Sequence, residues 1–181
     1  MNRIKTFFLM LTALFAVAFT SCSSDDNDDS TLSFTTAENQ INSYLAGTWV
    51  GDEYAMSTTT IYKTETIKFV PLAQPKEVKL TQPGEYVNID KTFKLIGKAH
   101  MVVGFGNDRK PINPEGEDYY YCFDASDMTI SLLRAYNDEV YLTKIDSRNI
   151  KKESGSKFFM KPTGLADLEA NWITFEKIVN E

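Results

Sequence analysis

The sequence predicts an all-β protein, an antiparallel meander closed into a barrel of about eight to ten short strands and preceded by a short helix. Segments rich in Thr, Ile, Val, Tyr and Trp recur along the chain, and Asn, Asp, Gly and Pro separate them. Helices do not alternate with these segments, as a parallel α/β sheet would require. The same pattern also fits a two-sheet β-sandwich, which is the alternative to the barrel.

The first predicted element is a helix that ends near Ala46. Thr35 and Glu38 have the spacing of a capping box, in which each side chain accepts a hydrogen bond from the other residue's backbone N–H. Gly47 follows, as is typical of a residue that closes a helix. The apolar positions of one helix face are Ala37, Ile41, Tyr44 and Leu45.

Short strands are expected through the rest of the chain. Apolar residues alternate with other residues from Phe93 to Phe105, with a bend near Gly97 and Lys98. A single helical turn is predicted near residues 165–170. The predicted strands are residues 48–56, 58–70, 76–80, 93–105, 119–123, 129–134, 139–145, 157–161 and 172–179.

Residues 1–21 have the pattern of a secretory signal peptide. Arg3 and Lys5 give a positive start, and Phe7–Phe19 is apolar apart from one threonine. This run is shorter than the roughly 20 residues that a membrane-spanning helix needs. We expect cleavage before Cys22; the alternative is an ordinary secreted protein in which this cysteine stands by chance.

The acidic segment at residues 22–30 is expected to be a solvated tether, because its dense negative charge and lack of apolar residues leave nothing to bury. Residues 31–181 form the predicted single domain. Removing residues 1–21 takes away Arg3 and Lys5 and no acid, so the net charge changes from −6 to −8. An acidic chain of this kind is not expected to bind nucleic acid.

The segment Phe19-Thr20-Ser21-Cys22 resembles the end of a lipoprotein signal peptide. The resemblance implies that Cys22 carries a diacylglyceryl thioether and an acylated amino group, which would anchor the protein in the outer membrane. The Ser/Asp run at Ser23–Ser30 resembles the export signal of Bacteroidota-type surface lipoproteins. This second resemblance implies that the domain faces the cell exterior; the periplasmic face is the alternative.

The segment Gly47-Thr48-Trp49, just after the predicted helix, resembles the opening motif of lipocalin-like (calycin) barrels. In that family the tryptophan plugs one end of the barrel and the glycine lets the chain turn into the first strand. The resemblance implies structural roles for Gly47 and Trp49. Trp172–Ile178 is similar to the closing strand of small lipocalin-like lipoproteins.

No catalytic or metal-binding constellation stands out, so an enzyme is not expected and neither is a cofactor. His100 is the sole histidine and is predicted to be a solvated strand residue. With Cys22 lipidated, Cys122 would be the sole thiol, and we expect it to behave as a small buried hydrophobe. The acids of the loop Gly104–Asp118 do not have the spacing of an EF-hand, and we interpret this segment as a solvated loop.

Tyr119 and Tyr121 share one face of a predicted strand and are candidates for ligand binding; core packing is the alternative. The predicted function is a non-enzymatic binding domain that takes one small apolar or amphipathic ligand in its interior or mouth. The alternative is a structural or interaction module that contacts another surface protein or a glycan through loops such as Gly104–Asp118.

Overall fold

A computed structural model describes residues 32–55, 59–82, 89–136, 139–168 and 171–179. The chain divides between Thr31 and Leu32, and all described residues belong to the part that begins at Leu32. The predicted signal peptide, the predicted lipid attachment at Cys22 and the acidic tether therefore lie outside the described residues. Among the residues that are described, no helix has the length and apolar character to span a membrane.

The helix α1 (Thr36–Leu45) begins with the predicted capping box. The Glu38 N–H donates to Thr35 Oγ1 at 3.2 Å, and the Thr35 N–H donates to the Glu38 carboxylate at 2.7 Å. Gly47, just past the helix, has a φ of +119°, a conformation that favours glycine because it has no Cβ. The predicted helix and its closing glycine are thus confirmed.

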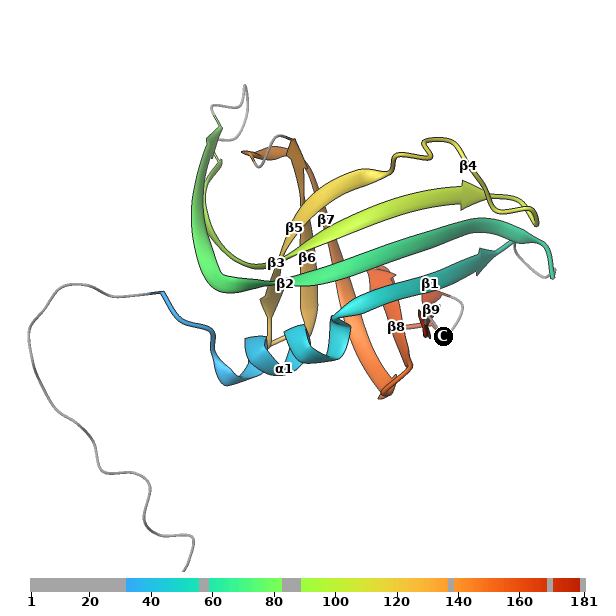
Figure 1. Ribbon diagram of the computed structural model, residues 1–181, viewed down its shortest axis with the longest axis horizontal. Helices are drawn as coiled ribbons and strands as arrows, with labels where there is room; N and C mark the ends of the chain where they lie inside the picture. The colour runs from blue at the N-terminus through green and yellow to red at the C-terminus, as the bar shows by residue number, and fades with distance from the viewer. Residues whose placement is uncertain (1–31, 56–58, 83–88, 137–138, 169–170, 180–181) are drawn as a thin grey trace, which may run out of the picture. The chain divides into compact units, whose positions relative to one another are not determined.

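The described part of the chain contains nine strands in one sheet, and eight of them close into a ring (Figure 1). Each ring strand pairs antiparallel with the next ring strand along the chain, and β9 returns to pair with β1. The short β4 pairs with β3. The strands are β1 (Gly47–Tyr54), β2 (Ile61–Gln82), β3 (Ile89–Phe105), β4 (Lys110–Pro111), β5 (Glu117–Asp124), β6 (Thr129–Tyr136), β7 (Glu139–Ser154), β8 (Lys157–Pro162) and β9 (Ile173–Ile178).

This ring confirms the predicted antiparallel meander with a helix before it. A β-sandwich would leave two separate sheets with edges, whereas here every ring strand has a hydrogen-bonded neighbour on both sides. The sandwich alternative is therefore wrong. Figure 1 shows α1 beside the start of β1. The side-chain amide of Asn42 in α1 donates to the Ile96 carbonyl of β3 at 3.0 Å.

Several predicted boundaries were wrong. The strands expected at 58–70 and 76–80 are one strand, β2, which begins at Ile61 and whose register shifts between Pro71 and Lys76; residue 58 lies outside the described residues. Proline lacks the N–H that a ladder needs, so the strand bends there without ending. β7 continues past Ile145 to Ser154, and β4 was not predicted. Residues 165–168 form no helix, and the rest of that predicted turn, 169–170, lies outside the described residues.

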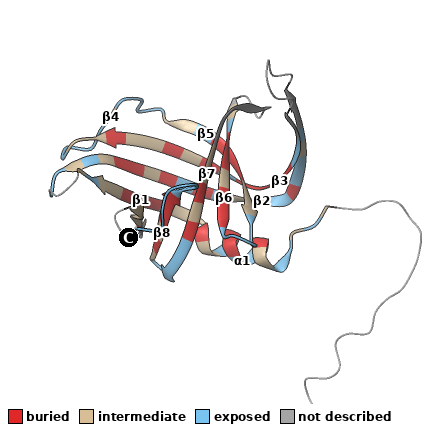
Figure 2. Cartoon of the chain, turned by 180° about the vertical axis from the view of Figure 1, so that it is seen from behind, coloured by how far each residue is buried: buried red, intermediate tan, exposed pale blue. Residues whose placement is uncertain are grey.

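Large side chains fill the ring at its α1 end. Trp49 is 0% exposed, and its indole N–H donates to the Leu45 carbonyl at 2.7 Å. The ring centroids of Trp49 and Phe158 lie 4.6 Å apart, and Phe158 stacks on Phe175 at 5.1 Å. Figure 2 shows buried positions along the strands around this interior. Burial of such aromatic side chains stabilises the fold, and no disulfide contributes among the described residues, where Cys122 is free.

Tyr121 lies across its cross-strand neighbour Gly97, and this contact needs a glycine. A Cβ at Gly97 would lie 2.1 Å from the tyrosine ring. The Tyr121 hydroxyl donates to Asn42 Oδ1 at 2.8 Å, which ties the wall of the ring to α1. The bend predicted near Gly97 and Lys98 lies next to the register shift between β2 and β3, within one continuous strand, and the bare backbone of Gly97 lets an aromatic ring pack there.

A second apolar cluster lies beside the register shift between β2 and β3, where Lys76 pairs with Leu95. It consists of Phe93, Leu95, Tyr120 and Leu133, with Cys122 packed against it. Tyr120 points away from the ring interior that holds Tyr119 and Tyr121, yet it is also buried. The β5 strand is therefore covered on both faces around Tyr120.

Candidate functional site at the open end of the ring

The ring is packed at one end and hollow at the other. Trp49 and α1 fill the end where β1 begins. At the opposite end, where β1 and β3 finish and β5 begins, there is a hollow of about 510 Å³, here called the mouth. Its lining residues are Lys63, Glu65, Met101, Val103, Phe105, Ile112, Asn113, Gly116, Glu117, Tyr119 and Asp146.

The floor of the mouth is an ion pair that crosses the interior of the ring. Glu65 on β2 and Arg148 on β7 belong to strands that are not neighbours in the sheet. Arg148 nevertheless donates from Nη1 to Glu65 Oε2, and from Nη2 to Oε1 at 3.1 Å. Glu65 is 2% exposed and Arg148 is 7% exposed. The bidentate pair therefore separates the packed core from the mouth.

Two further charges complete this network. Lys63 Nζ lies 2.6 Å from Glu65 Oε1, and Arg148 Nε donates to Asp146 Oδ2 at 2.8 Å. The Asp146 side chain is 38% exposed, and both of its hydrogen bonds from Arg148 end on the same oxygen. One carboxylate oxygen of Asp146 thus lies outside these two bonds.

The electrostatics keep both members of the buried pair charged. Burial alone would raise the pKa of Glu65, but hydrogen bonds and charges from Arg148 and Lys63 outweigh it and hold the pKa below its ordinary value. Burial would lower the pKa of Arg148, and Glu65 and Asp146 raise it instead. Removing such charges from water costs on the order of several kcal/mol per ion, which apolar side chains in the same place would avoid. A buried charged network in a hollow is a reason to look for function there.

A second polar group stands on the wall of the mouth. The Tyr119 hydroxyl donates to Glu117 Oε2 at 2.6 Å, and Arg134 Nη2 lies 2.8 Å from Glu117 Oε1. Burial and this hydrogen bond to a carboxylate raise the pKa of Tyr119. The tyrosine therefore stays protonated and presents a fixed hydroxyl at the wall.

The apolar part of the lining of the mouth comes from β3 and from the loop after β4. Met101, Val103 and Phe105 stand at every second position of β3 and so share the face that lines the mouth. Ile112, just past β4, is 80% exposed at the rim. A hollow with a charged floor and an apolar wall suits a ligand with one polar and one apolar part, and its volume is within the common range of small-molecule sites, roughly 300–1,000 Å³.

The candidate residues from the sequence analysis lie in different parts of the structure. Tyr119 lines the mouth, whereas Tyr121 is 0% exposed within the core, where burial raises the pKa of its hydroxyl. Gly47 and Trp49 have structural surroundings at the packed end, with Lys177 Cε 2.9 Å from where a Gly47 Cβ would stand. Cys22 lies outside the described residues.

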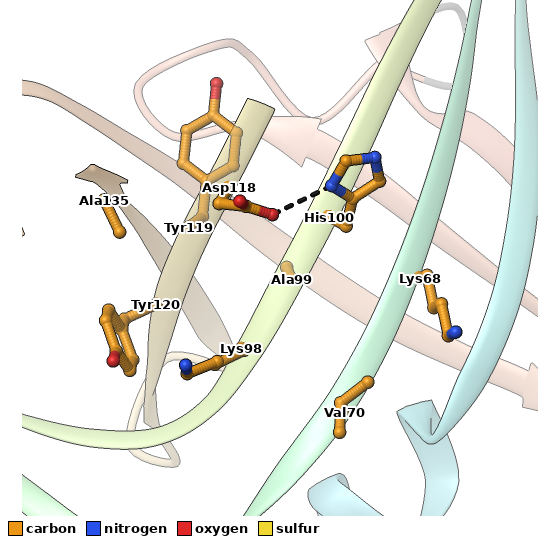
Figure 3. A pocket seen from close by; sticks show the side chains of 9 residues that line it. All are labelled: Lys68, Val70, Lys98, Ala99, His100, Asp118, Tyr119, Tyr120 and Ala135. Atoms are coloured by element: carbon orange, nitrogen blue, oxygen red, sulfur yellow. Dashed lines mark hydrogen bonds and ion pairs between the residues drawn. The ribbon is translucent and has the colours of Figure 1, made fainter. Parts of the chain in front are cut away.

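A second hollow, of about 320 Å³, lies on the outer wall (Figure 3). There His100 Nδ1 lies 2.8 Å from Asp118 Oδ1, and the side chains point toward each other. Such a pair supplies the base and the orienting acid of nucleophilic catalysis. None of the nine residues that line this hollow is a serine, threonine or cysteine, so the pair has no such nucleophile beside it there.

Cys122 is part-buried beside the second cluster, where its Sγ lies 3.8 Å from the Ser131 carbonyl. Burial raises the pKa of this thiol, which opposes formation of the reactive thiolate. Over the described ranges, no group of three or more His, Cys, Asp or Glu side chains is placed to hold a metal ion.

The sequence analysis did not identify the ion pair at the floor of the mouth, in which Glu65 lines the hollow and Arg148 is its partner. Glu65 had a usable signal, because it shares the two-residue period of the apolar positions Ile67 and Phe69 and so had to face inward. Arg148 had little signal, because it stands in a polar stretch that reads as a turn.

Comparisons with protein-family models, with curated proteins and with solved structures gave no match for this chain.

Proposed function

We propose that this protein is a lipid-anchored binding protein of the outer membrane, facing the cell exterior, whose mouth takes one small amphipathic ligand. The observation that carries the binding role is the mouth itself: a hollow of about 510 Å³ with apolar residues on one side and a buried ion pair as its floor. The proposed anchor is Cys22, and its support is the lipoprotein-like signal sequence that precedes it.

The packed interior sets where the ligand lies. Trp49, Phe69 and Phe158 fill the ring below the ion pair, so the ligand occupies the mouth and not the deep interior. We expect its apolar part to contact Met101 and Phe105, since burial of apolar surface there supplies affinity. Its polar part faces Asp146 and the floor, and that contact fixes its orientation.

The experiment is recovery of bound small molecules from the full chain, purified in detergent from its own cells and analysed by mass spectrometry. Val103→Trp fills the mouth with an indole, while Val70→Trp adds the same group to the outer wall, where Val70 is exposed. We expect one compound to accompany the wild type and the Val70→Trp protein, and to be lost from Val103→Trp. If all three proteins carry the same compounds, or if the wild type carries none, the proposed binding role is wrong.

The competing role is an interaction module that contacts another surface protein through the rim of the mouth. The observation that favours it is the exposure of Ile112 in the loop between β4 and β5, since a large apolar side chain at a loop tip is suited to a protein contact. A partner protein that co-purifies with the wild type and is lost from Ile112→Asp, with no small molecule recovered from the wild type, would favour this second role.

A further inference from the structure

Trp172 stands partly exposed on the outer wall of the ring and is held there by two contacts. Its indole N–H donates to Asp167 Oδ1 at 2.7 Å. Lys161 Nζ lies 5.3 Å from the centroid of the indole and donates to the Leu165 carbonyl at 2.8 Å. Lys161 is itself buried. The Trp172 indole is thus held in place before any ligand arrives, which lowers the entropy cost of binding a ligand against it.

Two hollows flank this tryptophan. One, of about 530 Å³, is lined by Lys151, Phe159, Asp167, Trp172 and Thr174. The other, of about 550 Å³, also includes Trp172 and Thr174. The two hollows share these two residues and are together called the Trp172 trough.

The lining alternates aromatic and hydrogen-bonding groups. Lys151, Phe159 and Thr174 form one cross-strand row over β7, β8 and β9, so an aromatic ring stands between an ammonium and a hydroxyl. Tyr54, at the end of β1, adds a second exposed ring to the other hollow. A ligand on this surface meets flat apolar faces and polar groups side by side.

The formal charges of the residues that line each hollow cancel, and the nearby Lys161 is buried. Lys151 and Asp167 balance in the first hollow. In the second, two cations face two anions: Arg109, Lys177, Asp52 and Glu176. The Arg109–Asp52 pair is already closed, with Nη2 and Oδ2 2.7 Å apart. A charged ligand therefore gains little here, and a neutral ligand rich in hydroxyls is favoured.

We propose that the Trp172 trough binds a neutral oligosaccharide, with the indole of Trp172 as the platform for one sugar ring. A pyranose has an apolar face of C–H groups that stacks on an aromatic ring and a rim of hydroxyls that bonds Lys151, Asp167 or Thr174. Two hollows that meet at one tryptophan suit a chain of sugars better than a single sugar. This site does not depend on the ligand proposed for the mouth.

The test is calorimetric titration of the full chain in detergent with cellohexaose, mannohexaose, xylohexaose and maltohexaose. Hexagalacturonate serves as the charged comparator. Trp172→Ala removes the platform, and Phe159→Ala removes the ring beside it. The matched control is Tyr62→Ala, an exposed aromatic on β2 that lines neither hollow of the trough. Circular dichroism checks that each variant folds.

We expect at least one neutral hexasaccharide to bind the wild type and Tyr62→Ala equally, and to bind Trp172→Ala at least about tenfold more weakly. If Trp172→Ala fails to fold, the same loss in Phe159→Ala carries the test. The proposal is overturned if no neutral hexasaccharide binds, if hexagalacturonate alone binds, or if the folded trough variants bind as tightly as the control.

Discussion

Arg148→Met tests whether the floor of the mouth is a buried ion pair on which stability depends. The substitution leaves Glu65, 2% exposed, without its bidentate partner. Removing one member of a buried pair typically costs about 3–5 kcal/mol, because the other charge stays buried. Lys63 remains 2.6 Å from the carboxylate and compensates in part, so we expect a loss near the lower end, about 3 kcal/mol.

Two further variants distinguish the loss of the ion pair from general damage to packing. The double variant Glu65→Leu/Arg148→Met removes both charges, and we expect it to be within about 1 kcal/mol of the wild type or more stable. Arg109→Met makes the same change of side chain at an ion pair in which Arg109 is 53% exposed and Asp52 is 15% exposed. Because Arg109 is solvated and Thr64 also donates to Asp52, we expect a loss of less than about 1 kcal/mol there.

The pH dependence follows from the pKa of Glu65. Its folded-state pKa lies below the ordinary value of 4.5 that it has when unfolded. The ionised pair therefore contributes fully above about pH 4.5, and the contribution is lost as the pH falls through the folded-state pKa. The difference in stability between the wild type and Arg148→Met should narrow over that acidic range.

Urea unfolding followed by circular dichroism measures each free energy, at neutral pH and at steps below pH 4.5. The reasoning is refuted if Arg148→Met costs no more than Arg109→Met. It is also refuted if the double variant is less stable than Arg148→Met, because the two side chains would then contribute through packing and not through charge.

Four other changes test separate parts of the molecule. Cys22→Ala should abolish labelling with radioactive fatty acid and release the protein from the membrane fraction; unchanged labelling would rule out the proposed anchor. Gly97→Ala places a Cβ 2.1 Å from the Tyr121 ring, so urea unfolding should show a loss of about 1–3 kcal/mol, and an unchanged midpoint would contradict this packing. Tyr121→Phe removes a buried hydrogen bond to α1 and should cost about 1 kcal/mol in the same assay, whereas no loss would show that the bond is not made. In Trp172→Phe the remaining emission comes from Trp49, which is 0% exposed, so acrylamide should quench it weakly; strong quenching would mean that the packed end is open.

The fold class was predictable because its signals are local. The Thr35–Glu38 capping box and Gly47 mark the ends of α1 within a few residues. The two-residue period of β3 shows which side chains face inward. Closure of the ring was expected on general grounds, since an open edge invites association, and the β1–β9 pairing supplies it.

The mouth was not predictable because it depends on contacts between distant strands. Glu65 and Arg148 are 83 residues apart in sequence. The period of β2 places Glu65 on the inward face, but nothing near it in sequence identifies its partner, and only the closed ring brings the two together. The same reason explains the error in β7: Asp146–Asn149 has turn-like composition, but Arg148 faces inward to a partner on β2, so the strand continues.

The ion pair also constrains what the mouth can select. A cationic ligand would have to compete with Arg148 or Lys63 for the Glu65 carboxylate, and an anionic ligand would have to compete with Glu65 for those cations; these contacts are already made. A ligand with hydroxyl or amide groups can instead bond the Asp146 carboxylate, of which one oxygen lies outside the Arg148 bonds, without breaking the floor. The apolar wall of β3 then holds the rest of the molecule. Selection by an uncharged polar group is the outcome that leaves the buried pair, and the stability it carries, intact.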